Sequence, residues 1–124
     1  MERRSAGHPV KKMNERTIET RMAKIFTDEE KRRVSVDCSG QSACLSVDVH
    51  GMDRFECMKY IRNLLALFRD PFQVRIVHGY NHGTALRDLV RNGGMLSPKV
   101  TSVSWDTRND GVTQLSVRGL CPLQ

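Results

Sequence analysis

Residues 45–77 constrain the fold most, because they have the pattern of a strand, a helix and a second strand. Apolar and polar residues alternate in 45–49 and again in 72–77, which is the period of a β-strand. The segment between them carries an apolar stripe at helical spacing, formed by Met58, Ile61, Leu64, Leu65 and Phe68. We therefore expect an α/β protein built around this unit.

The ends of the intervening helix are also marked in the sequence. Asp53 followed three residues later by Glu56 is a capping-box pattern, and Asp70-Pro71 is a stop signal. A helical crossover of this kind makes the two flanking strands parallel, so their C-terminal ends lie at the same edge of the sheet. Open α/β sheets bind their ligands at that edge.

Two polar motifs are predicted to meet there. Asp48-Val49-His50-Gly51 closes the first strand, and His78-Gly79 closes the second. Asp48 and His50 are two residues apart and so point to the same face. Histidine exchanges protons near neutral pH, and the aspartate could orient the ring, accept a proton or bind a metal. The structural alternative is that Asp48 caps the turn and His50 only packs at the strand end.

The segment His78-Gly79-Tyr80-Asn81-His82-Gly83-Thr84-Ala85-Leu86-Arg87 has the character of an anion site. This segment follows a strand, contains glycines and the two histidines His78 and His82, and leads into a helix predicted for Ala85 to Arg91. Glycines let backbone N–H groups approach a ligand, and a helix N-terminus favours negative charge. A phosphate group is therefore the first ligand to consider.

Individual side chains of this segment have both functional and structural interpretations. His78 is a candidate catalytic residue or a support for the loop. Tyr80 could stack on a base, and Arg87 could bind a phosphate or pair with Asp88 or Asp53. The predicted phosphate-binding set is Gly79, Tyr80, Asn81, His82, Gly83 and Arg87.

Metal binding has little support in the sequence. Three histidines near Asp48 could in principle hold zinc, but Cys38, Cys44, Cys57 and Cys121 form no Cys-x-x-Cys pair. The cofactor is left unknown, with Mg²⁺ or Mn²⁺ as the divalent candidates, although one carboxylate is thin support. The cysteines are expected to be reduced thiols, with Cys57 near the buried edge of its helix.

The two motifs, Val47-Asp48-Val49-His50-Gly51 and His78-Gly79-Tyr80-Asn81-His82-Gly83, resemble those of the small MutS-related (Smr) domain family. The leucine–arginine pair that follows the family's loop is matched by Leu86-Arg87. The resemblance runs from about residue 45 to about residue 118. Asn81 stands where the family usually has a second glycine, and the loop has one extra residue before Leu86.

The resemblance implies a fold similar to the C-terminal domain of translation initiation factor 3, and a nuclease that acts on DNA or RNA. Together with a hairpin predicted from strands at 100–105 and 112–118, it gives a two-layer α/β sandwich in the order β-α-β-α-β-β, with a four-stranded mixed sheet. Asp48, His50 and His78 would be the catalytic residues. The alternative is a non-catalytic module that binds nucleic acid or the ribosome. Trp105 is expected in the core.

The remaining chain is divided into a basic N-terminal extension, 1–43, partly disordered or helical, and the Smr domain, 44–124. Helices are possible at 17–24 and 27–33, the second with a capping box at Thr27 and Glu30. Residues 1–33 hold 10 Lys/Arg and 6 Asp/Glu in a chain of net charge +6, which favours a nucleic acid partner. Without a membrane span or signal peptide, a cytoplasmic protein is expected, and we expect a monomer.

Overall fold

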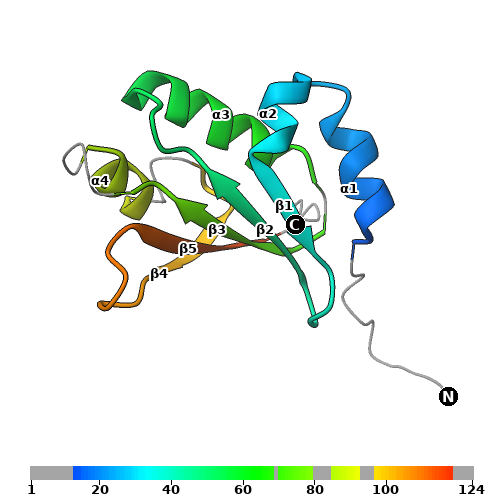
Figure 1. Cartoon of the computed structure of the whole chain (residues 1–124). Helices are drawn as coiled ribbons and strands as arrows, with labels where there is room; N and C mark the ends of the chain where they lie inside the picture. The colour runs from blue at the N-terminus through cyan, green and yellow to red at the C-terminus, as the bar shows by residue number, and fades with distance from the viewer. Residues whose placement is uncertain (1–12, 69, 80–84, 93–96, 119–124) are drawn as a thin grey trace, which may run out of the picture.

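The computed structural model describes residues 13–68, 70–79, 85–92 and 97–118. Its elements form a mixed α/β domain with a single sheet in the described part (Figure 1). Along the chain they are α1 (Glu15–Met22), α2 (Asp28–Arg32), β1 (Val34–Asp37), β2 (Ala43–Asp48), α3 (Arg54–Ala66), β3 (Phe72–Val77), α4 (Ala85–Arg91), β4 (Val100–Ser104) and β5 (Val112–Val117). The strands lie in the order β1-β2-β3-β5-β4.

The predicted strand–helix–strand unit is confirmed. β2 and β3 are parallel, with Leu45 opposite Val74 and Asp48 opposite Val77. Helix α3 begins with the expected capping box, in which the Asp53 carboxylate accepts from the Glu56 backbone N–H at 2.8 Å. The hairpin of β4 and β5 is also confirmed, and β5 pairs antiparallel with β3.

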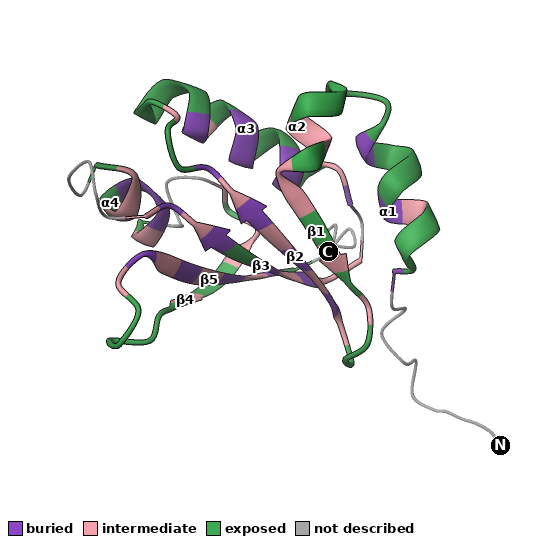
Figure 2. Ribbon diagram, in the orientation of Figure 1, coloured by how far each residue is buried: buried purple, intermediate pink, exposed green. Residues whose placement is uncertain are grey.

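Burial alternates along the strands as the pattern requires (Figure 2). The face that carries Leu45, Val74 and Leu115 packs under the helices and forms one core with their apolar side chains. The opposite face carries partly exposed polar side chains such as Ser46 and Gln114. No helix of the described residues covers this second face (Figure 1).

The prediction of four strands is wrong, because β1 adds a fifth. Val34–Asp37 pairs antiparallel with β2, placing Ser35 opposite Ser46. The polar stretch 39–42 is the turn of this hairpin rather than a break in structure. Its first residue, Ser39, donates from its backbone and its hydroxyl to the Asp37 carboxylate at 2.9 and 2.6 Å, as in an Asx-turn.

Residues 13–33, which the sequence assigns to the extension, contribute to the same core. Helices α1 and α2 form as expected, and α2 has the Thr27–Glu30 capping box. The buried side chains of this segment are Met13, Ile18, Met22 and Phe26, of which Ile18 and Met22 lie on α1. Tyr60 on α3 stacks with Phe26 at 5.0 Å between ring centroids and donates to the Glu30 carbonyl at 2.6 Å. Helix α2 is therefore fixed against α3.

The cysteines, Trp105 and the lengths of the helices bear on three further expectations. Cys57 is buried, and Cys38, Cys44 and Cys57 are free thiols. Trp105 is not in the core: its side chain is 47% exposed and stacks on the Arg91 guanidinium at 4.3 Å. No helix in the described ranges combines the length and apolar character needed to cross a bilayer.

Candidate functional site

The C-terminal ends of β2 and β3 bring the two sequence motifs together, as their parallel direction predicts. Asp48 and Val77 are register partners, and the Val49 N–H donates to the Val77 carbonyl at 2.9 Å. Beyond them, Gly79 approaches His50 so closely that a Cβ on Gly79 would lie 3.7 Å from the His50 Cβ. Gly79 has φ +73°, a left-handed conformation that glycine adopts without strain.

Asp48 and His50 form a hydrogen-bonded pair at this edge. His50 Nδ1 lies 2.5 Å from Asp48 Oδ1, and the His50 backbone N–H donates to the same oxygen at 3.1 Å. Gly51, with φ 86°, turns the chain immediately afterwards. The His50 side chain is 67% exposed. An ionised carboxylate only accepts, so Nδ1 carries a proton and Nε2 is the ring nitrogen available for proton transfer with a ligand.

The carboxylate of Asp48 is kept ionised by its surroundings. Partial burial alone would raise the pKa of Asp48, but the side-chain and backbone hydrogen bonds from His50, with electrostatic attraction to His50 and Arg33, outweigh it. The pKa of Asp48 therefore lies below its ordinary value. Near neutral pH the carboxylate can hold the His50 ring in one orientation and stabilise it when it becomes positively charged.

Arg33 is a site residue that the sequence did not indicate. Its Nη1 donates to the backbone carbonyls of Asp48 and His50 at 3.0 and 3.4 Å. In return, the Asp48 N–H donates to the Arg33 carbonyl at 2.9 Å. The residue at the end of α2 thus fixes the backbone that carries the Asp48–His50 pair and brings a positive charge beside it.

His78 occupies a different environment from His50, since it is buried and hydrogen-bonded through both ring nitrogens. Nδ1 lies 2.9 Å from the Gly79 carbonyl, and Nε2 lies 2.9 Å from the Thr113 hydroxyl. A carbonyl only accepts, so Nδ1 donates and Nε2 accepts from Thr113. Burial, with Arg91 and Arg87 adding to it, lowers the pKa of His78. Its geometry therefore suits support of the loop better than contact with a substrate.

The pKa of His78 leads to a prediction about stability. Because the unfolded chain takes up a proton at His78 below about pH 6.5 and the folded chain resists it, we expect the free energy of unfolding to fall as the pH drops through that range. Urea unfolding at a series of pH values measures this loss. His78→Asn should lack this part of the pH dependence, whatever its absolute stability; equal pH slopes in the two proteins would contradict the prediction.

A chain of polar contacts continues from His78 to helix α4. The Thr113 hydroxyl accepts from Arg91 Nε at 2.9 Å, and Arg91 Nη1 donates to Asp110 at 3.1 Å. Arg87 Nη1 donates to the other Asp110 oxygen at 2.5 Å, and its Nε makes a long contact of 3.5 Å with Asp88. Arg87, predicted to bind phosphate, is thus engaged in fixing α4 to the loop before β5.

The rest of the predicted phosphate-binding set lies outside the described residues: Tyr80, Asn81, His82 and Gly83. The described residues include no group of three or more His, Cys, Asp or Glu side chains that could hold a metal ion. At the described edge, Asp48 supplies the carboxylate, and one of its oxygens is bonded to His50. One carboxylate is enough for Mg²⁺ only where substrate phosphates and waters supply the other ligands, so these residues alone would not hold the ion.

No protein-family model and no curated protein matches the sequence. Among solved structures, the crystal structure of the Smr domain of Thermus thermophilus MutS2 is similar, with a TM-score of 0.47 and 23% sequence identity. The match covers 59% of this chain and 96% of that one.

Proposed function

We propose that this protein binds nucleic acid and cleaves its phosphodiester bonds. The observation that carries the proposal is the exposed Asp48–His50 pair at the sheet edge, next to the glycine at the start of the histidine-containing loop. A histidine oriented by a carboxylate is suited to move a proton in a transition state. The net charge of +6 favours a polyanion as the substrate.

The site suits RNA better than DNA. Water is a poor attacking group without a metal, and the described residues provide no cluster of ligands that would hold one without the substrate. RNA carries its own nucleophile in the 2′-hydroxyl. His50 Nε2 would take the proton of this hydroxyl while the 2′-oxygen attacks the neighbouring phosphorus. The bond from phosphorus to the 5′-oxygen breaks, the leaving oxygen takes a proton from solvent or from an acid such as His82, and a 2′,3′-cyclic phosphate remains.

Three groups would hold and neutralise the phosphate. The backbone N–H groups that follow Gly79 in the sequence would bind its oxygens, since glycine permits close approach, whereas the Gly79 N–H itself donates to the Gly111 carbonyl at 3.0 Å. Arg33 brings positive charge to the same edge. Arg87 would attract the phosphate by its positive charge and not through a bidentate hydrogen bond, because its guanidinium is already bonded to Asp110.

The second candidate is a module that binds nucleic acid or a ribosomal surface without cleaving it. The engagement of Arg87 with Asp110 favours this alternative, because it removes a predicted donor for the charge that develops on the phosphate. Salt-sensitive binding without any product would identify such a module.

A cleavage assay with a defined substrate distinguishes these functions. We expect cleavage of labelled single-stranded RNA in the presence of EDTA, with a cyclic phosphate on the product. A matched RNA with a single 2′-deoxynucleotide on the 5′ side of the scissile bond should not be cut there. Cleavage of that RNA at the same bond, or EDTA-sensitive cleavage of duplex or branched DNA, would contradict the proposed mechanism.

A further inference from the structure

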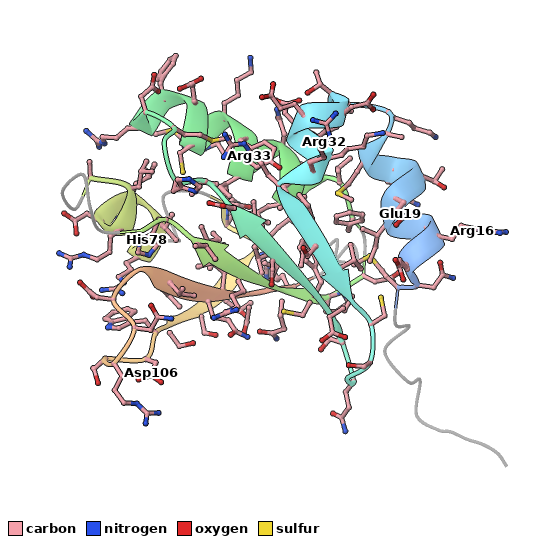
Figure 3. The ribbon with its side chains drawn as sticks, in the orientation of Figure 1. Arg16, Glu19, Arg32, Arg33, His78 and Asp106 are labelled. Atoms are coloured by element: carbon pink, nitrogen blue, oxygen red, sulfur yellow. The ribbon has the colours of Figure 1, made fainter. Side chains whose placement is uncertain are left out.

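A cleft of about 500 Å³ opens directly beside the Asp48–His50 pair. It lies where α2 meets the ends of β1 and β2, and Figure 3 shows Arg32 and Arg33 together at this place. Its lining includes the charged side chains of Glu29, Arg32 and Arg33 along with Asp48 and His50. None of these charged residues from α2 belongs to the segment that resembles the Smr family, which begins near residue 45.

Small side chains make the space in this cleft. Ser35 and Ser46 both line it, and they are register partners in the β1–β2 hairpin. Ser35 is exposed and Ser46 is partly exposed, on the sheet face that no described helix covers. The serine hydroxymethyl group is among the smallest polar side chains. The two serines therefore leave space above the strands and can also form hydrogen bonds with a ligand.

The two arginines of the cleft have different roles in the folded protein. Arg33 is fixed by its bonds to the Asp48 and His50 carbonyls. Arg32 is exposed, and it makes no side-chain hydrogen bond or ion pair with any residue that the structure describes. Its guanidinium can therefore bind a ligand without breaking a described contact. A planar guanidinium is well suited to a phosphate.

We propose that this cleft is a subsite for one nucleotide of a single-stranded nucleic acid, adjacent to the phosphodiester bond for whose cleavage His50 is the general base. The inference rests on the proposed function and names its substrate class. The volume suits a small organic ligand, and a single strand can place a base in it without the cost of unstacking and unpairing that a duplex would incur. Arg32 binds the phosphate of this nucleotide, and Glu29 and the serines offer acceptors and donors for its base or sugar.

Filling the cleft tests the proposal. Ser35→Trp places an indole over the floor from an exposed position on an edge strand, where aromatic residues are well tolerated. The matched control is Ser102→Trp, an exposed serine on β4, the opposite edge strand. The probe is a single-stranded RNA of about 10 nucleotides with 2′-O-methyl groups, which prevent cleavage while binding is measured. We expect Ser35→Trp to weaken binding about tenfold, equivalent to ~1.4 kcal/mol, and the control to bind as the wild type does.

A second variant keeps the test meaningful if Ser35→Trp fails to fold. Arg32→Ala should lower the slope of log affinity against log salt by about 0.7, the contribution of one phosphate contact on a single strand. Arg16→Ala removes the same charge from α1, where the side chain points away from the cleft (Figure 3), and should leave the slope unchanged.

The outcomes separate the two proposals. Wild-type protein that binds neither RNA nor DNA would overturn the proposed function and this inference together. Wild-type binding that Ser35→Trp and Arg32→Ala leave unaltered would overturn the cleft alone, as would tighter binding to duplex than to single-stranded RNA. Weakened binding in these two variants, with both controls unaffected, would establish the subsite whether or not the protein cleaves.

Discussion

His50→Ala is expected to reduce the rate of RNA cleavage by about 10²- to 10⁴-fold, the contribution of a general acid or base. Binding of the same RNA should weaken far less than cleavage, because the His50 ring is 67% exposed and hydrogen-bonds to Asp48, although it also lines the cleft beside this pair. Removing it opens no cavity in the core. The measurement is the single-turnover cleavage rate at saturating protein, with binding followed separately on a 2′-O-methyl RNA.

Two further measurements separate proton transfer from a structural role of His50. Added imidazole should partly restore cleavage in His50→Ala, since a free base can enter the exposed space, whereas a merely structural defect would not respond. Asp48→Asn keeps an oxygen that accepts from Nδ1 but removes the negative charge, so it should slow cleavage by less than His50→Ala does. Undiminished cleavage in His50→Ala would remove this residue from the mechanism.

The sequence predicted the elements that are determined by local pattern. Helix α3 has its capping box and apolar stripe within 16 residues, and β2 and β3 have clear alternation. The direction of the two strands then followed from the crossover, which is why the approach of His50 to Gly79 could be expected from sequence. The pairing of Asp48 with His50 is equally local, because they are two residues apart on one strand end.

The parts that were missed depend on contacts between distant segments. His78 bonds to Thr113, 35 residues away, and Arg87 bonds to Asp110, 23 residues away. No sequence pattern marks such partners, so the structural interpretation of His78 could not be preferred before the geometry was known. Arg33 lies in a basic segment and belongs to no motif, although it fixes the strand end that carries Asp48 and His50.

Strand β1 was missed for a different reason. It has four residues, and its alternation covers only Val34 and Val36. The polar residues that follow β1 could belong to a linker or to a hairpin turn, because both have this composition. Only the pairing of β1 with β2, which is seen in the structure, identifies them as a turn. Once β1 joins the sheet, the segment of residues 13–33 can pack against the domain, and Met13, Ile18, Met22 and Phe26 become part of its core.

The burial of α1 leads to the second large prediction. Ile18→Ala is expected to lower the free energy of unfolding by about 2–5 kcal/mol, the usual cost of truncating a fully buried isoleucine. Ile18 has no exposed surface and belongs to the main core, together with Met22 and Phe26. Urea unfolding followed by circular dichroism measures the change, and a single cooperative transition should remain.

Ile25→Ala is the matched control, since it removes the same atoms from the same N-terminal region. Ile25 is 49% exposed, so its truncation should cost well under half of the Ile18 value. If residues before β1 were only an attached extension, the two variants would have equal and small effects. A large difference between them would instead show that α1 stabilises the domain.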